Sequence, residues 1–479
     1  MKVLFATSEA HPFLKTGGLA DVAFALPKAL RALGIDVRVI MPKYSDISEC
    51  YKSNMVTLKE FNINLGWRNQ YVGLQYMEEE DIPFYFIDNE YYFKRKGAYG
   101  YDDDGERFCY FSKAVLESVR YMNDFKPHII HNNDWHTAII PVLLKENYSN
   151  DKLYSSIQTI LTIHNLRYQG VFSKEFLGDL LSLGEEYFAE DKLKYHDAIS
   201  FMKGGIVYSD RVTTVSETYA QEIQTSFYAE GLDGLLKEKS YKLSGIVNGI
   251  DYDIYNPKKD KDIYLNYSEE NIVNKKKNKE MLQQQLGLPV NKDIPMIGII
   301  SRLVDQKGFD LISEVIDDIM NLDLQMVILG TGDNKYEKMF KYYAGKYPTK
   351  ISCNIYFSND LSKKIYAGSD LFLMPSLFEP CGIGQLIAMQ YGTLPIVRET
   401  GGLRDTVIPC NEYTGKGNGF SFTNYNAKDM LYTIERAINF YKDKPVFNNI
   451  VRNAMRTDNS WNSSAYKYIE LYDELLWNK

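Results

Sequence analysis

The segment from residue 370 to residue 405 constrains the fold of this 479-residue chain more than any other stretch. An apolar run at 371–375 is typical of a buried parallel strand. A loop carrying one carboxylate, Glu379, follows, then a helical pattern at about 385–391 and a second apolar strand at 394–397. Open α/β sheets bind ligands at the carboxyl ends of their strands, so we expect Glu379 at a ligand site, near the backbone N–H groups of a helix start.

Size and composition narrow the class of protein. The length favours two domains, since a single hydrophobic core rarely grows to this size. The net charge of −8 argues against sequence-independent binding of nucleic acid. Five scattered cysteines without a C-x-x-C pair predict neither a disulfide framework nor a zinc site. The first residues look like a strand and not a signal peptide, and no apolar run approaches the ~20 residues of a membrane span. We therefore expect a soluble cytoplasmic protein, of an oligomeric state that the sequence leaves open.

The N-terminal part shows strand, glycine loop, helix and strand in succession. Strands are expected at 3–6 and 37–41, with KTGGL at 15–19 and a helical pattern at 20–33 between them. Adjacent glycines at a helix start let a ligand approach the backbone closely, and Lys15 can add a point charge for phosphate. A plain helix start with a solvated lysine explains the loop equally well, so both interpretations stay open.

Polar clusters follow two later strands. The short strand 129–130 leads into HNNDWH at 131–136, and the strand 158–163 leads into His164 and Asn165. Both clusters are expected at the edge of the sheet where loops carry function. The spacing is not H-E-x-x-H and no cysteine assists, so a metal site is disfavoured. Structural hydrogen bonding and contact with a polar substrate both remain, and we prefer substrate contact.

The alternation of strands and helices is interrupted between residues 247 and 257. We predict two Rossmann-like doubly wound domains, at 1–247 and 248–457. A last helix within 458–479 is expected to pack back on the first domain. The lysine-rich run 258–279 is expected to be solvated.

A cationic loop follows the first strand of the second half. Arg302 and Lys307 lie between that strand and a predicted helix at 309–320, and together they suit a diphosphate. Two surface ion-pair residues explain them as well. The sequence GTG at 330–332 does not stand in the first strand–helix turn, so the nicotinamide-binding fingerprint is absent.

Four further segments have recognisable patterns. Alternating aromatic and polar residues predict hairpin strands at 62–87, and a long surface loop is expected at 88–105. A helix is predicted at 198–208 and a strand at 354–357.

Two α/β halves with facing loops favour a ligand in the cleft between them. Lys15, Arg302 and Lys307 can converge on an anionic group. The polar side chains at the other strand ends, Glu379 and His164 among them, suit hydroxyl groups. A sugar joined to a diphosphate meets both demands.

The sequence resembles the bacterial glycogen synthases and plant starch synthases over nearly its whole length. The shared motifs are K-x-G-G-L at 15–19, N-D-W-H at 133–136, T-x-H-N-x-x-Y-Q-G at 162–170, N-G-I-D at 248–251, S-R-L-x-x-Q-K-G at 301–308 and P-S-x-F-E-P-C-G-x-x-Q-L at 375–386. The first of these separates the family from most other glycosyltransferases with the two-domain GT-B fold.

The resemblance implies the GT-B fold, with an acceptor-side catalytic domain at 1–247 and a nucleotide-sugar-binding domain at 248–457. It also implies retaining transfer of glucose from ADP-glucose to the non-reducing 4-OH of an α-1,4-glucan such as glycogen, without cofactor or metal. Three groups of residues carry over by position: the diphosphate contacts Lys15, Gly18, Arg302 and Lys307; the sugar contacts Glu379 and the backbone N–H groups of Cys381, Gly382 and Ile383; and the hydroxyl or acceptor contacts Asp134, His164 and Asn165. The expected catalytic residues are Glu379, Arg302, Lys307 and His164. Phe357 stands where the family often has a tyrosine against the adenine, and its ring can stack without donating a hydroxyl.

Two positions depart from related enzymes. Many retaining GT-B enzymes have a second glutamate where Ile387 stands, and some have a threonine where Gly384 stands, so ribose contacts must come from elsewhere. Glu379 is the one clear carboxylate, which disfavours a two-carboxylate mechanism and favours attack from the face that the diphosphate leaves. Arg302 and Lys307 would stabilise the leaving group, and neutralising either should lower kcat and leave folding intact.

Other functions fit the same residues. A GT-B transferase with another nucleotide sugar or a small acceptor is one alternative. A glucan-binding regulatory protein without activity is another.

Overall fold

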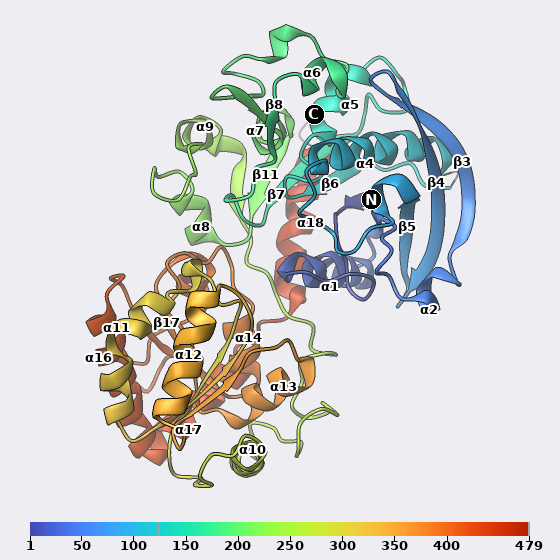
Figure 1. Cartoon of the computed structure of the whole chain (residues 1–479). Helices are drawn as coiled ribbons and strands as arrows, with labels where there is room; N and C mark the ends of the chain where they lie inside the picture. The colour runs from blue at the N-terminus through green and yellow to red at the C-terminus, as the bar shows by residue number, and fades with distance from the viewer. Residues whose placement is uncertain (123, 478–479) are drawn as a thin grey trace. The chain divides into compact units, whose positions relative to one another are not determined.

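The computed structural model describes residues 1–122 and 124–477, which form two compact units (Figure 1). Unit 1 consists of Met1–Asn248 and the segment that begins at Trp461, and unit 2 is Gly249–Ser460. The sequence placed the corresponding boundaries after residues 247 and 457. Among the described helices, none combines the length and the hydropathy that a membrane crossing requires.

Unit 1 is built on a nine-stranded sheet in the order β12-β11-β7-β6-β1-β2-β5-β4-β3. Neighbours pair in parallel from β12 to β5, and β4 and β3 extend the sheet in antiparallel fashion. The strands are β1 (Lys2–Ala6), β2 (Asp36–Pro42), β3 (Val56–Leu65), β4 (Arg68–Glu79), β5 (Ile82–Asp88), β6 (Ile129–Asn133), β7 (Gln158–Ile163), β11 (Arg211–Thr214) and β12 (Leu243–Gly245). A small second sheet pairs β8 (Val171–Ser173), β10 (Ala198–Ser200) and β9 (Lys194–Tyr195).

The helices of unit 1 connect and cover these strands. The longer ones are α1 (Gly18–Ala32), α4 (Asp104–Ser118), α5 (Ile140–Asn147), α7 (Phe201–Tyr208) and α18 (Trp461–Trp477). The short ones are α2 (Glu49–Lys52), α3 (Glu90–Phe93), α6 (Phe176–Asp179), α8 (Glu217–Glu222), α9 (Asp233–Glu238), η1 (Val119–Tyr121), η2 (Glu185–Tyr187) and η3 (Ser240–Lys242). The last helix, α18, packs against α1 and adds Tyr468 and Tyr472 to the core of unit 1.

Unit 2 has a six-stranded, wholly parallel sheet in the order β15-β14-β13-β16-β17-β18. The strands are β13 (Met296–Ile300), β14 (Gln325–Leu329), β15 (Ile351–Asn354), β16 (Leu371–Met374), β17 (Leu394–Arg398) and β18 (Phe420–Phe422). The helices are α10 (Val273–Gln285), η4 (Asp305–Lys307), α11 (Phe309–Asn321), α12 (Asn334–Lys346), α13 (Asn359–Gly368), α14 (Gly384–Gln390), α15 (Gly401–Thr406), α16 (Ala427–Lys442) and α17 (Lys444–Arg456).

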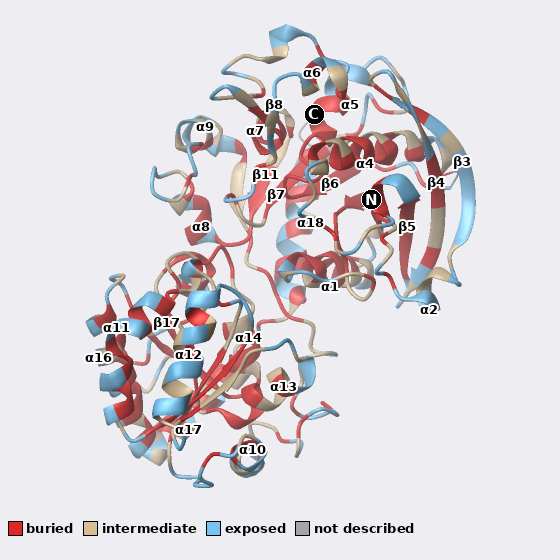
Figure 2. Cartoon of the chain, in the orientation of Figure 1, coloured by how far each residue is buried: buried red, intermediate tan, exposed pale blue. Residues whose placement is uncertain are grey.

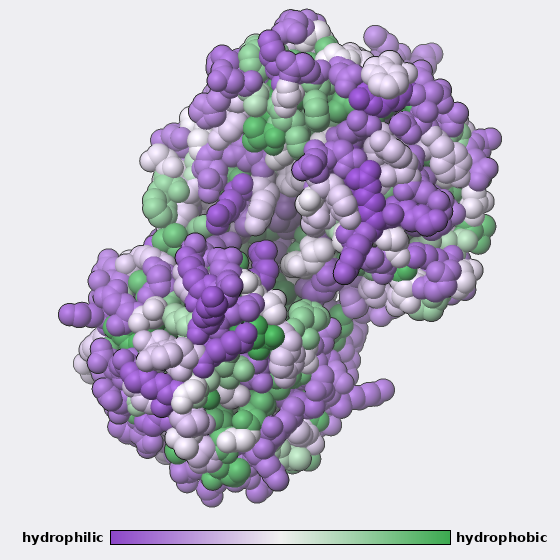
Figure 3. Space-filling model, in the orientation of Figure 1, coloured by the Kyte–Doolittle hydropathy of each residue, from purple (hydrophilic) through white to green (hydrophobic). Residues whose placement is uncertain are grey.

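Each unit has its own hydrophobic core, formed by its strands and the inner faces of its helices. Figure 2 shows the central strands and these helix faces as buried, whereas the edge strand β3 and the outer faces of the helices are largely exposed. Polar residues make up most of the face seen in Figure 3, with smaller hydrophobic areas between them. Burial of apolar surface therefore stabilises the two units separately.

The structure confirms the strand–helix–strand unit that the segment 370–405 predicts. β16, α14 and β17 begin and end within one or two residues of the predicted limits, which is the usual uncertainty of element ends. The hairpin strands β3 to β5 are also confirmed, although β3 starts earlier than predicted.

Several local predictions are wrong. The predicted helix 198–208 begins with a strand, β10, because Ser200 caps α7 by accepting a hydrogen bond from the Lys203 N–H at 3.1 Å. A strand was predicted at 354–357, but β15 runs from Ile351 to Asn354. Phe357 therefore lies in the loop that follows the strand. The segment 88–105 is not wholly a surface loop, since Tyr92 in α3 is fully buried.

The lysine-rich run 258–279 is not fully solvated either. Lys275 is buried and donates to the carbonyls of Tyr366 and Ala367, and Lys279 is paired with Asp370 at 2.6 Å. Buried lysines of this kind are tolerated because each ammonium finds acceptors, a condition that charge patterning along the sequence does not reveal.

Candidate active site

In each sheet the strand order changes direction at one point, between β1 and β6 in unit 1 and between β13 and β16 in unit 2. Loops leave the two strands in opposite directions at such a point, which opens a crevice at their carboxyl ends. Five of the predicted site residues follow these four strands: Lys15 comes after β1, Asp134 after β6, Arg302 and Lys307 after β13, and Glu379 after β16. His164 and Asn165 follow β7, and Phe357 follows β15.

The centre of the unit 2 site is an ion pair between Lys307 and Glu379. The distance from Lys307 Nζ to Glu379 Oε2 is 2.5 Å, and the side chains are 17% and 9% exposed. The Ser376 hydroxyl donates to the same carboxylate oxygen at 3.1 Å. The site therefore holds a largely desolvated carboxylate whose charge is balanced by a lysine from the neighbouring strand's loop.

The two loops that carry this pair are joined by backbone contacts. The Leu377 N–H donates to the Gln306 carbonyl at 2.9 Å, and the Gln306 amide donates to the Phe378 carbonyl at 3.1 Å. Gly308 has φ 73°, and a Cβ at this position would lie 2.0 Å from the Pro375 carbonyl oxygen. A glycine is required here because the conformation is left-handed and the neighbouring backbone leaves no room.

The glycine turn after β17 packs on the backbone of the Glu379 loop. The Gly402 N–H donates to the Glu379 carbonyl at 3.2 Å, and a Cβ on Gly401 would lie 2.0 Å from that oxygen. The T-G-G sequence therefore fixes the main chain at Glu379.

The next residues, Cys381 to Ile383, lead into α14. Cys381 is buried, and Gly382 has φ 72°. The Gln385 amide donates to the carbonyls of Cys381 and Gly382 at 3.1 and 2.9 Å, which orients the turn. The first N–H groups of a helix have no intrahelical partner, so this turn can present donors to a ligand oxygen.

Two of the predicted residues make no polar contact with this cluster. Arg302 is exposed, and within residues 1–122 and 124–477 its guanidinium has no ion-pair partner. Phe357 is 78% exposed in the loop after β15. Arg302 is thus a free cation next to the Lys307 loop, and Phe357 is an apolar surface available for stacking.

In unit 1 the KTGGL motif, which the sequence predicts to be a phosphate-binding loop, has its lysine in an ion pair. Lys15 Nζ is paired with Asp21 Oδ1 at 2.7 Å, so the lysine is not the isolated point charge that the sequence suggests. Gly18 begins α1, whose N-cap, Gly17, offers no side-chain cap. The loop therefore presents a partly neutralised lysine beside a helix start.

A buried glutamate that the sequence analysis overlooked holds this loop. Glu9 is 2% exposed, and its Oε2 accepts the Thr16 N–H at 2.7 Å and the Thr16 hydroxyl at 2.6 Å. Burial raises the pKa of Glu9, and the two bonds from Thr16 oppose that shift. An acidic residue three positions after the end of the first strand was the available signal.

Asp134 organises the second half of the unit 1 site. It adopts φ 57°, and its Oδ1 accepts the backbone N–H groups of His164 and Asn165 at 2.8 and 3.4 Å. Burial raises the pKa of Asp134 to about 7, although the two backbone bonds act in the other direction. Asp134 therefore contacts the backbone of the two other residues predicted with it.

Hydrogen bonds of Asn133 define the tautomer of His164. The Asn133 amide nitrogen donates to the Ala6 and His131 carbonyls at 3.0 and 3.3 Å, so its oxygen faces His164 Nε2 at 2.9 Å. Nε2 must then carry the proton, which leaves Nδ1 as an acceptor. Burial lowers the pKa of His164 to about 3, so the ring stays neutral and suits hydrogen bonding to a hydroxyl.

The other histidines of this region have structural surroundings. His131 is fully buried, with hydrogen bonds to the hydroxyls of Tyr472 at 2.8 Å and Thr162 at 2.6 Å. His136 lies in an aromatic cage with ring centroids of Tyr99 at 4.6 Å and Trp135 at 4.1 Å. Nowhere in the described part of the chain do three or more His, Cys, Asp or Glu side chains gather in a way that could hold a metal ion.

Comparison with known proteins agrees with this geometry. The family model described as the starch synthase catalytic domain matches residues 2–238, and the model described as glycosyl transferases group 1 matches residues 279–455. Glycogen synthases of Clostridium acetobutylicum and Caldicellulosiruptor bescii are 61% and 59% identical over 477 residues, which is 99% of this chain and 100% of each relative.

Solved structures extend the comparison to three dimensions. The catalytic domain of starch synthase IV from Arabidopsis thaliana, bound to ADP and acarbose, is 35% identical with a TM-score of 0.92 and covers 99% of both chains. A sucrose-phosphate synthase from Thermosynechococcus elongatus, 15% identical with a TM-score of 0.63 over 100% of both chains, shares the fold. The chain therefore has the two-domain GT-B fold and belongs to the glycogen synthase and starch synthase family of glycosyltransferases, enzymes that transfer glucosyl units to a glucan.

Proposed function

We propose that the chain elongates an α-1,4-glucan, glycogen, by transferring glucose from ADP-glucose to the 4-OH of a non-reducing end with retention at the anomeric carbon. The observation that carries the proposal is the desolvated Lys307–Glu379 pair beside the unpaired Arg302 at the strand-order reversal of unit 2. This arrangement offers cations for a diphosphate and a carboxylate for sugar hydroxyls at one place. The relative from Arabidopsis was solved with ADP and acarbose, which are chemically a nucleoside diphosphate and an oligosaccharide mimic.

In unit 2 the proposed donor contacts divide by charge. Arg302 binds the diphosphate bidentately, and the Lys307 ammonium, with three N–H donors, can hold Glu379 and a phosphate oxygen together. Glu379 and the N–H groups at Cys381 to Ile383 hold the glucosyl ring. Phe357 stacks on the adenine.

In unit 1 the proposed contacts are hydrogen bonds and one cation. Lys15 and the Gly18 N–H suit phosphate oxygens. His164 Nδ1 accepts from a glucosyl or acceptor hydroxyl, and Asp134 and Asn165 complete the polar lining. Because its pKa is about 3, His164 orients hydroxyls in its neutral form and does not act as a proton donor near neutral pH.

The proposed step needs no cofactor and no second carboxylate. The bond between the anomeric carbon and the β-phosphate oxygen breaks while a bond to the acceptor O4 forms on the same face. The acceptor proton passes to the departing phosphate oxygen, which ADP carries away. Arg302 and Lys307 stabilise the charge that develops on that oxygen.

The test is release of ADP or UDP from ADP-glucose and UDP-glucose, each with and without glycogen. The proposal expects release of ADP that depends on glycogen, together with an increase in glucan length. Release from UDP-glucose alone would assign another donor. Absence of release from both sugars, in a preparation that still binds glycogen, would refute the proposal in favour of a glucan-binding protein.

A further inference from the structure

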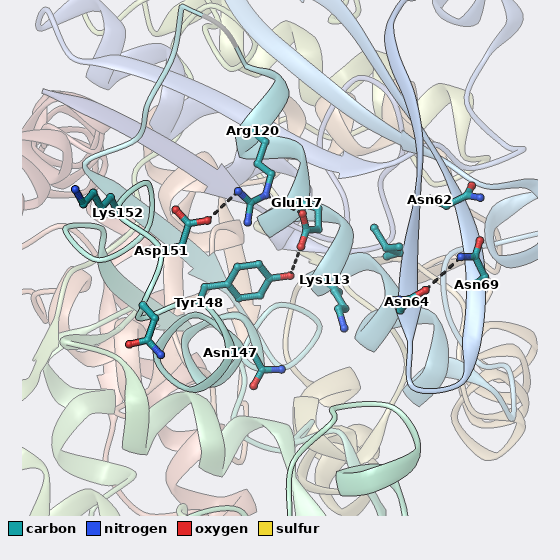
Figure 4. A pocket seen from close by; sticks show the side chains of 12 residues that line it. Asn62, Asn64, Asn69, Lys113, Glu117, Arg120, Asn147, Tyr148, Asp151 and Lys152 are labelled. Atoms are coloured by element: carbon teal, nitrogen blue, oxygen red, sulfur yellow. Dashed lines mark hydrogen bonds and ion pairs between the residues drawn. The ribbon is translucent and has the colours of Figure 1, made fainter.

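A large polar pocket in unit 1 lies outside the site described above. It has a volume of about 1050 Å³ between the β3–β4 hairpin, α4 and the end of α5 (Figure 4). Arg120 in its wall contacts Glu117 at 3.0 Å and Asp151 at 2.8 Å, and the Tyr148 hydroxyl donates to Glu117 at 2.7 Å (Figure 4). The arginine and the carboxylates of this pocket therefore bind one another and not a residue of the site.

A glycine turn after β14 has no part in the proposed function either, but it does contact the site. This GTG turn, Gly330 to Gly332, joins β14 to α12. It is not a nicotinamide-binding fingerprint, which stands in the first strand–helix turn of a domain. Gly332 pairs instead with Leu303 in the cation loop, residues 301–308, which leads from β13 to α11 and carries both cations of the unit 2 site.

The two cations of this loop are held in different ways. Lys307 is paired with Glu379, and the residue before it, Gln306, donates to the Phe378 carbonyl. Both partners belong to the loop after β16. The Arg302 guanidinium has no ion pair or hydrogen bond within residues 1–122 and 124–477. Its position therefore depends on the backbone that carries it.

The GTG turn fixes that backbone. The Leu303 N–H donates to the Thr331 carbonyl at 2.9 Å, and the Asp333 N–H donates to the Leu303 carbonyl at 2.7 Å. These bonds extend the parallel pairing of β13 with β14 beyond the ends of the two strands. Leu303 is also fully buried. Arg302 is thus an exposed side chain on a main chain that is held in place.

Neither outer position of the turn has room for a side chain. A Cβ on Gly330 would lie 1.8 Å from the Ser301 carbonyl oxygen, and one on Gly332 would lie 2.4 Å from the Leu303 carbonyl oxygen. Contacts this short would force the backbone of the cation loop to move. The two glycines therefore allow direct contact with the residues on both sides of Arg302.

The first turn of α12 holds the same loop at Asp305. The Tyr336 hydroxyl donates to Asp305 Oδ1 at 2.6 Å, and the Lys335 ammonium is paired with the same oxygen. The Tyr336 ring is buried, which fixes the direction of its hydroxyl. The Glu337 carboxylate accepts the Gly332 N–H at 3.0 Å and so joins the start of the helix to the GTG turn.

We propose that Gly332 and Tyr336 are positioning residues for Arg302. Their contacts hold residues 302–305 in one conformation, so the guanidinium meets the diphosphate without prior ordering of the loop. The inference rests on the proposed function, which assigns the diphosphate to Arg302. The benefit is greatest in the transition state, when negative charge develops on the leaving oxygen. Lys307 needs no such support, because Glu379 holds it directly.

The test is Tyr336→Phe, which removes one hydroxyl and keeps the buried ring. A matched control lies at the other end of α12, where Tyr347 donates to Asp317 at 2.7 Å and Lys346 is paired with the same oxygen at 2.7 Å. The chemistry is the same, but Asp317 belongs to α11 and not to the cation loop. The assays are kcat and KM for ADP-glucose with glycogen, the Kd of ADP by calorimetry, and urea unfolding.

We expect Tyr336→Phe to lower kcat roughly fivefold and to raise the Kd of ADP by a similar factor, which corresponds to the net loss of one hydrogen bond. Tyr347→Phe should leave kcat and Kd at the wild-type values. Both variants should lose a similar amount of unfolding free energy. Equal effects of the two substitutions on kcat and Kd, or no effect of Tyr336→Phe, would overturn the proposal.

A double-mutant cycle separates positioning of Arg302 from a general structural role. In the Arg302→Met background, Tyr336→Phe should have almost no further effect on kcat or on the Kd of ADP, because the cation that these contacts position is absent. Gly332→Ala should show the same lack of additivity with larger effects, since its Cβ displaces the backbone itself. Losses by the same factor in both backgrounds would refute the proposal.

The calorimetry needs no catalysis, so the two proposals can fail separately. A wild type that binds ADP but releases none from ADP-glucose would refute the proposed function. The comparison of Tyr336→Phe with Tyr347→Phe by ADP affinity would then still decide whether these contacts position Arg302.

Discussion

Replacement of Lys307 by methionine should separate the structural role of this residue from its role in the reaction. Lys307→Met keeps most of the side-chain stem but leaves Glu379 without its cation. Breaking a buried pair by removal of one partner costs about 3–5 kcal/mol. The cost here should be nearer about 2–3 kcal/mol, because the Ser376 hydroxyl remains on the same carboxylate oxygen and contributes about 1 kcal/mol.

Thermal and urea unfolding measure this difference directly. For a unit of about 150–250 residues, a loss of that size lowers the transition temperature by about 5–10 °C. The double variant Lys307→Met/Glu379→Gln should recover most of the stability, because no buried charge is then left unpaired. Both variants should lose activity by about two to three orders of magnitude, since a group that stabilises leaving-group charge is missing.

Arg302→Met is the matched control. Arg302 is exposed and unpaired in the described chain, so its replacement should change the unfolding free energy by less than about 0.5 kcal/mol while activity falls just as far. The sequence alone led us to expect that neutralising either cation leaves folding intact; with the ion pair in view we expect this for Arg302 and not for Lys307. A Lys307→Met protein as stable as the wild type, or a double variant as unstable as the single one, would refute this reasoning.

Three further substitutions test other parts of the site. Gly401→Ala should destabilise unit 2 and reduce activity, because its Cβ would meet the Glu379 carbonyl. Gly345→Ala in α12, where a Cβ has no neighbour within 4 Å, should instead stabilise the protein by up to about 1 kcal/mol in urea unfolding. Glu9→Gln should weaken both bonds to Thr16 and raise the KM for ADP-glucose. In a double-mutant cycle with Thr16→Val the two effects should not add, and full additivity would show that the residues act independently. The pKa of Asp134 is about 7 when folded and about 3.9 when unfolded. The stabilising contribution of this group is therefore present below about pH 4 and is lost as the pH rises through 7. Asp134→Asn should flatten this fall in unfolding free energy with pH, and an unchanged slope would contradict the assignment.

The sequence predicts the parts of the fold that depend on local pattern. Alternating strands and helices around residues 371–397 are apparent because apolar runs and helical periods are properties of neighbouring residues. The placement of Glu379, Arg302 and Lys307 after adjacent strands follows from the parallel sheet. The pattern of apolar and polar residues therefore predicts the fold, and it also predicts the end of each sheet at which the site residues lie.

The contacts among site residues depend on side chains distant in sequence, which local pattern does not specify. The pairing of Lys307 with Glu379 joins residues 72 positions apart, and the bond from Asn133 that sets the tautomer of His164 spans 31. The prediction that the run 258–279 is solvated is wrong at Lys275 for the same reason, since its acceptors lie on α13 and near β17. Glu9 was overlooked because its function is to hold a loop, and nothing in the residue type alone distinguishes that role.

The path of the chain also sets an order of synthesis. Unit 2 is one continuous segment, but unit 1 is complete only when α18 has been made, because Tyr472 from that helix supplies the hydroxyl that His131 binds in the core. On the ribosome, domains fold as units once their whole sequence has emerged. The second domain can therefore reach its final form before the first has its closing helix. A message truncated before residue 461 would yield a first domain in which His131 keeps Thr162 but lacks the Tyr472 hydroxyl on its other ring nitrogen.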